Sequence, residues 1–164
     1  MGQLVIGISD LKIAAPPDTL ITYALGSCVG ICLIDPAARV GGLSHIMLPD
    51  SKAAPGDSNA YKFADTALPQ LIKQMEQKGA ARARLKAKIA GGAQMFGKTA
   101  GAGGNSEVWQ IGQRNVAAVT ATLQKLGIPI VAKDVLADYG RTVLFDPATG
   151  IMTVKSLNKT VKEL

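Results

Sequence analysis

Short runs of apolar residues, separated by turn-forming residues, dominate the pattern of hydrophobic and polar positions along this chain. Such runs, rich in Val, Ile and Leu, are typical of β-strands. Pro, Gly, Asp and Asn lie between many of them and favour turns. The expected strands are residues 4–8, 11–14, 20–25, 28–34, 40–48, 85–90, 130–135, 142–145 and 151–154.

Two stretches instead carry apolar residues at the spacing of an amphipathic helix, one at about 59–78 and one at about 112–126. Asp57 or Ser58 can cap the first helix, and a glycine follows each helix as its stop. The residues expected to face the core are Phe63, Ala67, Leu71, Met75, Val116, Val119 and Leu123. Together these elements predict an α+β fold, with mixed and antiparallel β-sheets packed against two main helices.

The composition is that of a single compact domain. Of the 164 residues, 48% are hydrophobic and 18% are charged, so disorder is not expected. No repeat or long linker divides the chain, and we expect one domain over residues 1–164, with 155–164 as a tail. The sequence shows neither a membrane-spanning run nor a signal peptide. Its two cysteines are four residues apart on one expected strand, which puts them too far apart in space to form a disulfide. These features predict a cytoplasmic protein without membrane insertion.

The net charge of +6 comes largely from basic residues at 82–88 and 155–162. Proteins that bind nucleic acid usually interleave basic residues with aromatic ones, and aromatic residues are only 4% of this chain. We therefore expect no nucleic-acid partner. A basic face that docks an acidic protein partner is the favoured interpretation.

Candidate chemistry is concentrated in the hairpin predicted from the fourth and fifth strands. It holds both cysteines, Cys28 and Cys32, and the only histidine, His45. A thiol and an imidazole can together perform nucleophilic catalysis. If residues 35–38 form the loop, Cys28 lies directly opposite His45, although a slip of one residue would put them on opposite faces. Structural roles for the Cys and the His remain the alternative, and we interpret Cys32 as a core residue.

Gly26 and Ser27, directly before Cys28, predict a tight bend. Such a bend can expose the thiol and direct backbone N–H groups toward a developing oxyanion. Ser27 can equally be an ordinary turn residue. One His and two Cys cannot form a standard structural zinc site, so no metal or cofactor is expected.

Residues 92–99, GAQMFGKT, match the G-x-x-x-x-G-K-[ST] pattern of phosphate-binding loops. In that motif the lysine and the hydroxyl residue begin a helix that faces the phosphates. Here three glycines fall within 101–104, and glycine is a poor helix former. We interpret the match as a coincidence and keep nucleotide binding as the weakest alternative.

Several blocks in the same order resemble one known family over nearly the whole chain. They are LGSCVGICLID, GGLSHIMLP, YKFADTALPQLIKQM, KIAGGAQMF, IGQRN and YGRTVLFDPATG. The chain resembles CheD, the chemoreceptor glutamine deamidase family of bacterial and archaeal chemotaxis. The resemblance implies a cysteine-hydrolase-like fold, similar to the catalytic domain of the cytotoxic necrotizing factor. It also implies that Cys28, His45 and Thr22 form the catalytic set, with Thr22 orienting the imidazole.

The implied activity is hydrolysis of glutamine side chains of methyl-accepting chemotaxis receptors to glutamate, with release of ammonia and a thioester intermediate on Cys28. The resemblance further implies the phosphatase CheC as a partner, so a module that mainly regulates CheC is the alternative function. It raises a role on the substrate or partner face for Phe96, Arg114 and Asn115. One departure is Leu136-Ala137, where the family usually carries Gly-Gly.

Overall fold

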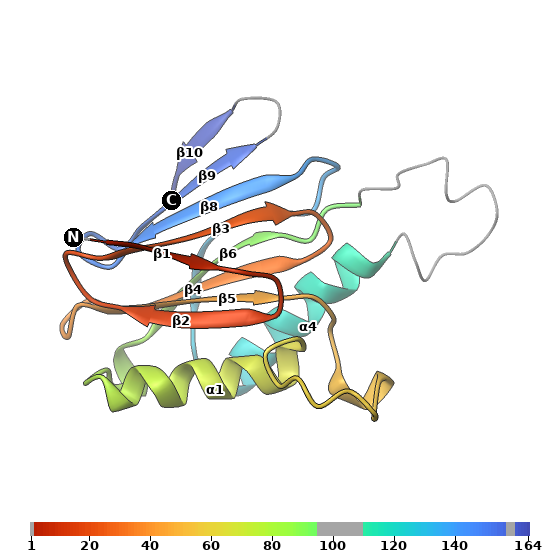
Figure 1. Ribbon diagram of the computed structural model, residues 1–164, viewed down its shortest axis with the longest axis horizontal. Coiled ribbons are helices and arrows are strands. Elements are labelled where there is room, and N and C mark those ends of the chain that lie inside the picture. The colour runs from red at the N-terminus through yellow and green to blue at the C-terminus, as the bar shows by residue number, and fades with distance from the viewer. Residues whose placement is uncertain (1, 95–109, 157–159) are drawn as a thin grey trace.

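Two five-stranded β-sheets lie face to face, and two helices cover the outer face of one of them (Figure 1). The computed structural model describes residues 2–94, 110–156 and 160–164. The first sheet contains, in spatial order, β1 (Gln3–Ile6), β3 (Thr19–Leu25), β8 (Arg141–Asp146), β9 (Ile151–Ser156) and β10 (Val161–Glu163). The second sheet contains, in spatial order, β2 (Asp10–Ala14), β5 (Val40–Ile46), β4 (Val29–Asp35), β6 (Lys86–Gly91) and β7 (Ile130–Val135). The helices are α1 (Ala64–Gln77) and α4 (Ile111–Lys125), and single 3-10 turns are η1 (Ser51–Ala53) and η2 (Arg82–Arg84).

This arrangement confirms the predicted α+β domain. Both sheets are mixed, because β1 pairs with β3 and β6 pairs with β7 in parallel while the other pairs are antiparallel. All nine predicted strands are present, and their ends differ from the prediction by at most two residues. The strand pattern of the sequence is therefore a reliable guide to this fold.

Strand β4 lies at the centre of the second sheet, which explains its continuous apolar run. All seven of its residues are buried, because the helices cover one face of the sheet and the first sheet covers the other. β4 pairs with β5 so that Asp35 lies opposite Val40, and residues 36–39 form the loop between them.

The hairpin register predicted from the sequence is wrong by one position on each strand. Gly30, and not Cys28, lies directly opposite His45. Asp35 stays in the strand because its carboxylate accepts hydrogen bonds from two N–H groups of the loop and from Arg84. The Arg84 guanidinium holds the pKa of the Asp35 carboxyl far below its usual range. Asp35 thus stabilises the turn from its position at the end of β4. The prediction was wrong because it placed Asp35 in the loop.

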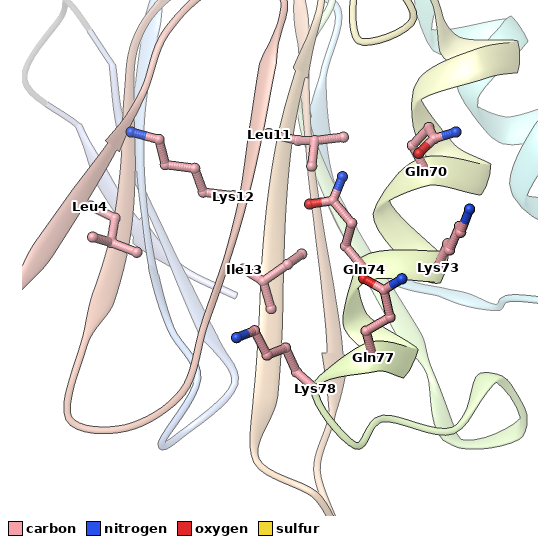
Figure 2. A pocket seen from close by; sticks show the side chains of 9 residues that line it. All are labelled: Leu4, Leu11, Lys12, Ile13, Gln70, Lys73, Gln74, Gln77 and Lys78. Atoms are coloured by element: carbon pink, nitrogen blue, oxygen red, sulfur yellow. The ribbon is translucent and has the colours of Figure 1, made fainter.

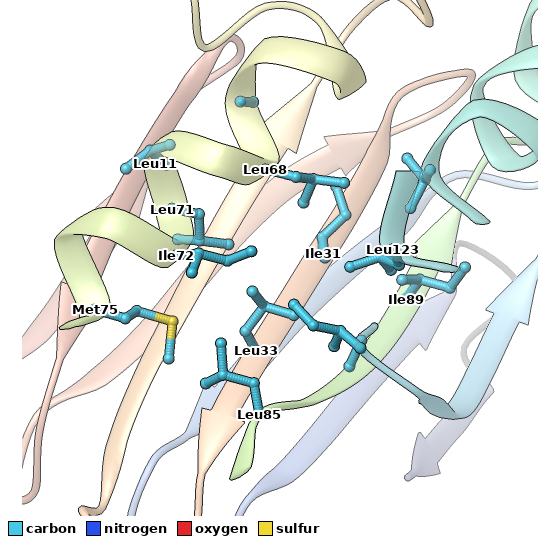
Figure 3. Close-up of a cluster of buried hydrophobic side chains, with 14 of the residues drawn as sticks. Leu11, Ile31, Leu33, Leu68, Leu71, Ile72, Met75, Leu85, Ile89 and Leu123 are labelled. Carbon is cyan, nitrogen blue, oxygen red and sulfur yellow. The ribbon is translucent and has the colours of Figure 1, made fainter. Parts of the chain in front are cut away.

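Hydrophobic side chains form two cores, one on each face of the second sheet. Figure 3 shows the core beneath the helices, where the apolar face of α1 points toward Ile31 of β4. Consecutive glycines in β5 allow close packing on both faces. A Cβ atom at Gly42 would lie 2.7 Å from Leu71 Cδ1, and one at Gly41 would lie 3.0 Å from the Phe145 ring. The small residues let α1 and the first sheet approach the same strand from opposite sides.

Helix α1 begins at Ala64, later than the predicted start near residue 59. The polar residues expected to cap it form local turns instead, because Asp57 accepts a hydrogen bond from the Asn59 N–H and pairs with Lys62 at 2.6 Å. Both helices end before a glycine with positive φ, as predicted. Of the residues predicted to face the core, Val116 is half-buried, and the buried ones are Phe63, Ala67, Leu71, Met75, Val119 and Leu123.

The expected tail at 155–164 is an incorrect prediction. Strand β10 pairs with β9 and extends the first sheet. Lys162 lies 3.3 Å from the carboxylate of Asp134, and Lys88 Nζ donates a 2.7 Å hydrogen bond to the Leu164 carbonyl. These contacts fasten the C-terminal residues to both sheets.

Leu136 and Ala137, where the family usually carries glycines, have positive φ values of 67° and 60°. L-residues adopt this left-handed conformation at a cost that glycine avoids. The turn is held in place by backbone contacts, since the Leu136 N–H donates to the Gly91 carbonyl and Arg141 Nη2 donates to the Leu136 carbonyl. This chain therefore holds two non-glycine residues in the left-handed conformation at this turn.

Candidate active site

The predicted site residues come together at one end of the sandwich. Strands β1, β3 and β5 all run toward that end (Figure 1). Thr22 is the central residue of β3, His45 is the penultimate residue of β5, and Cys28 directly precedes β4. His45 and Thr22 are fully buried, whereas Cys28 is partly exposed. A partly exposed thiol and a buried imidazole thus lie at neighbouring strands.

Cys28 is a diagonal cross-strand neighbour of His45. His45 lies opposite Gly30, and Cys28 is two residues before Gly30, which places it on the same face of the sheet. A Cβ atom at Gly30 would lie 3.1 Å from the Leu25 side chain of the first sheet. This face is therefore the one between the two sheets. Continuing the register places Cys28 opposite Met47, whose side chain is 41% exposed and therefore open to an incoming molecule.

A short chain of hydrogen bonds determines which nitrogen of His45 carries its proton. Thr22 Oγ1 lies 2.7 Å from the Ile6 carbonyl oxygen and 2.7 Å from His45 Nδ1. The carbonyl can only accept, so the single hydroxyl proton of Thr22 is donated to Ile6. The Thr22 oxygen must then accept from His45 Nδ1–H. A neutral imidazole in this tautomer carries a lone pair on Nε2, which is buried and has no hydrogen-bond partner among the described residues.

Burial keeps both reactive groups uncharged at neutral pH. It lowers the pKa of His45 to about 4. It also raises the pKa of the Cys28 thiol, an effect that the Cys28 backbone N–H partly opposes. The resting pair is therefore a thiol and a neutral imidazole, not an ion pair. Such an imidazole is ready to accept a proton when the thiol attacks.

The backbone around Cys28 is held by a glycine pair at the end of β6. The Gly92 N–H donates to the Cys28 carbonyl, and the Ala93 N–H donates to the Gly26 carbonyl, both at 2.8 Å. Gly91 and Gly92 have positive φ, and a Cβ atom at Gly91 would collide with the Cys28 carbonyl oxygen. The first residues of the apparent phosphate-binding motif thus support the cysteine. The rest of that motif, from residue 95 onward, lies outside the described residues.

The bend before Cys28 forms as predicted, and it follows an irregularity in β3. The pairing register with β8 shifts after Thr22, and Ala24 has a φ of 59°. The Gly26 N–H donates to the Ala24 carbonyl at 3.1 Å, so it is engaged within the bend. Gly26 therefore acts as a turn residue, and the N–H groups of Ser27 and Cys28 are the remaining candidates for an oxyanion site.

Asn115 occupies a different place from the surface position expected for it. It is fully buried in the first part of α4, and its Nδ2 donates to the Ser27 carbonyl at 2.9 Å and to the Met47 carbonyl at 3.0 Å. Because both partners only accept, the orientation of the amide is fixed. Asn115 thereby joins the residue before Cys28 to the residue two after His45. The sequence offered no signal for this contact, which depends on how α4 docks on the sheet.

The other candidate residues differ in what the structure says of them. The Arg114 side chain is exposed on the same turn of α4, while Phe96 lies outside the described residues. Cys32 is a fully buried core residue between the sheets, as predicted, and both cysteines are free. Among the described residues no cluster of three His, Cys, Asp or Glu side chains is placed to hold a metal ion. Within residues 2–94, 110–156 and 160–164, no helix is long and apolar enough to cross a membrane.

Comparison with known proteins identifies one family. The family described as "CheD chemotactic sensory transduction" matches residues 47–156. A protein of Syntrophomonas wolfei named "Probable chemoreceptor glutamine deamidase CheD" is 49% identical over 152 residues, covering 93% of this chain and 92% of its own length. Proteins with the same name from Lachnoclostridium phytofermentans and Caldanaerobacter subterraneus are 42% and 48% identical. The first of these alignments covers 100% of both chains and the second covers 96% and 94%, so the full-length alignment includes Thr22, Cys28 and His45.

Proposed function

The chain belongs to the CheD family, and we propose that it is a protein-glutamine deamidase that converts glutamine side chains of chemotaxis receptors to glutamate. The observation that carries this proposal is the proton arrangement at His45. Nδ1–H is committed to Thr22, and the Nε2 lone pair is unpartnered among the described residues. This is the form of the imidazole that a general base requires.

In the proposed reaction, His45 Nε2 takes the thiol proton of Cys28 as the sulfur attacks the amide carbon of the substrate glutamine. The N–H groups of Ser27 and Cys28 stabilise the oxyanion. His45 then donates its proton to the departing ammonia, which leaves a thioester. A water molecule activated by His45 hydrolyses the thioester to glutamate and restores the thiol. Thr22 holds the imidazole in the reactive tautomer throughout.

Five parts of the proposal depend on the family resemblance: the substrates, the cellular location, the partner, the role of Arg114 and the fold relationship. The substrates are the cytoplasmic domains of methyl-accepting receptors, and the enzyme acts in the cytoplasm. CheC is a binding partner, and exposed Arg114 belongs to the face that meets substrate or partner. The fold is related to cysteine hydrolases such as the catalytic domain of the cytotoxic necrotizing factor. The two stacked sheets, with the cysteine and the histidine at neighbouring strands of one of them, support this relationship.

The test is the intact mass of a receptor cytoplasmic fragment after incubation with the protein. Each deamidation adds about one dalton, because the amide NH₂ is replaced by OH after thiolate attack. We expect a mass gain with the wild-type protein and with Cys32→Ala, and none with Cys28→Ala. Cys32→Ala is the matched control, since it removes a thiol from the same strand region. A folded wild-type protein that modifies no receptor fragment would contradict the proposal.

A further inference from the structure

A groove of about 530 Å³ lies between the N-terminal strands and α1, away from the candidate active site. β1 and β2 are edge strands of their sheets, so this side of the sandwich carries no further described strand. Figure 2 shows side chains from both strands and from α1 around the groove. The lining residues are Leu4, Leu11, Lys12, Ile13, Gln70, Lys73, Gln74, Gln77 and Lys78.

All the charged side chains that line this groove are positive. Its three ammonium groups belong to Lys12, Lys73 and Lys78, and no Asp or Glu is among the lining residues. Lys73 and Lys78 form no ion pair among the described residues, and Lys12 Nζ donates only to the Val5 carbonyl. Elsewhere a carboxylate pairs with each of Lys62, Arg84, Arg141 and Lys162. The groove thus concentrates unpaired positive charge.

The rest of the lining suits a polypeptide. Leu4, Leu11 and Ile13 provide an apolar floor, and Figure 2 shows Gln74 extending from α1 toward Leu11. Gln70 and Gln77 on α1 offer side-chain amides that can donate to carboxylates or to peptide carbonyls, while Gln74 Nε2 already donates to the Tyr61 hydroxyl at 2.9 Å. An apolar floor with amide and ammonium groups around it matches a polypeptide segment that carries carboxylates.

We propose that this groove binds an acidic segment of the protein substrate, outside the catalytic site. This inference rests on the proposed function for the identity of the substrate. Leu11 directly follows Asp10, which pairs with His45, so the groove begins one strand away from the histidine and extends toward Lys78. A substrate can therefore occupy the groove and the site together.

The binding test uses a 20-residue Glu-Ala-rich peptide with a fluorescent label, and a peptide in which serine replaces every glutamate. The groove variant is Lys12→Gln/Lys73→Gln/Lys78→Gln. We expect its dissociation constant for the glutamate peptide to rise about tenfold at low salt, because three weakly screened charge pairs are lost. The matched control, Lys125→Gln/Lys133→Gln/Lys155→Gln, removes the same charge from exposed lysines elsewhere and should bind like the wild-type protein.

The kinetic test uses a receptor fragment and a small glutamine dipeptide. The groove variant should show a raised KM for the fragment, an unchanged kcat, and unchanged activity on the dipeptide. Since Lys12 contacts the backbone of β1, the double variant Lys73→Gln/Lys78→Gln guards against a folding defect. Equal losses in the groove and control variants, or equal binding of both peptides, would overturn the proposal. Peptide binding does not require catalysis, so it tests the groove even if no receptor is modified.

Discussion

The buried His45 links the proposed chemistry to the acid stability of the molecule. It is fully buried, and desolvation lowers its pKa to about 4 from an ordinary value of 6.5. Between these two values the unfolded chain binds a proton that the folded chain excludes. The free energy of unfolding must therefore fall as the pH falls through this window.

We predict that His45 alone removes up to about 3 kcal/mol of stability between pH 6.5 and pH 4. It is the only histidine in the chain, so no other imidazole titrates in this pH range. Urea unfolding of the wild-type protein and of His45→Gln across this range measures the effect. The variant should have a flatter profile above pH 4. Parallel profiles would mean that His45 titrates normally in the folded state.

At this scale the sequence pointed to the candidate residues but not to their hydrogen bonds. Cys28 and His45 were recognisable because both cysteines and the only histidine fall on one hairpin. The contact of Thr22 with His45 was implied only by family resemblance, because it joins two different sheets. The Ile6 carbonyl was missed altogether, since a backbone acceptor leaves no trace in the amino-acid pattern.

At the scale of elements, Asn115 of α4 joins the segment before β4 to the segment after β5. Gly112 lets the first turn of the helix approach closely, because a Cβ atom there would collide with the Gly92 and Ala93 carbonyl oxygens. The amide of Asn115 then reaches the carbonyls of Ser27 and Met47.

We predict that Asn115→Ala costs about 2 kcal/mol of stability, because two buried carbonyls lose their donor. It should also lower kcat on a receptor fragment by about tenfold, with little change in KM, because Cys28 is displaced from His45. Steady-state kinetics and urea unfolding measure the two effects. Arg114→Ala, on the exposed neighbouring position, should leave kcat unchanged. A folded Asn115→Ala protein with normal kcat would refute the positioning role.

A second prediction at this scale concerns the turn after β7. Leu136→Gly and Ala137→Gly should each stabilise the protein by about 0.5–1 kcal/mol, because relief of the left-handed strain outweighs the entropy that glycine adds to the unfolded chain. Thermal unfolding measures the gain. Leu126→Gly is the control, since Leu126 has a φ of −82° and should lose stability. Destabilisation by both turn variants would show that the side chains contribute more than the strain.

The elements themselves were largely predictable, and the errors have local causes. Apolar runs in the sequence correctly predicted nine strands. The predicted register of the hairpin was wrong because Asp35 belongs to β4 and not to the loop. The predicted start of α1 was too early because the Asp57 carboxylate accepts a hydrogen bond within a local turn and does not cap the helix. Strand β10 was missed because its residues, exposed and partly charged, do not alternate with buried ones.

On the scale of the whole molecule, the site is assembled from three layers. Thr22 comes from the first sheet, Cys28 and His45 come from the second, and Asn115 comes from the helical layer. None of the layers holds the site by itself. The pairing of sheets into this sandwich could not be read from the sequence, because a strand pattern does not state which sheet a strand joins.

The two cysteines should report separately on the surface and on the interior. Cys28 is partly exposed, whereas Cys32 is fully buried between the sheets and burial raises its pKa. We predict that iodoacetamide modifies Cys28 in the native protein, while Cys32 reacts only at the rate of global unfolding. Peptide mass mapping over a urea series separates the two, and Cys28→Ala isolates the second reaction. Rapid labelling of Cys32 in native conditions would mean that the sheets separate locally.

The hydrogen bond from Thr22 to Ile6 carries a consequence for how this enzyme can be studied. Any amino acid at position 6 supplies the same carbonyl oxygen, so a complete scan of side chains would classify the position as an ordinary core residue. Only a change in the main chain, such as an ester in place of the Ile6–Gly7 amide, weakens that acceptor. Side-chain mutagenesis will therefore not detect the Ile6 carbonyl oxygen, which helps to determine which nitrogen of His45 carries the proton.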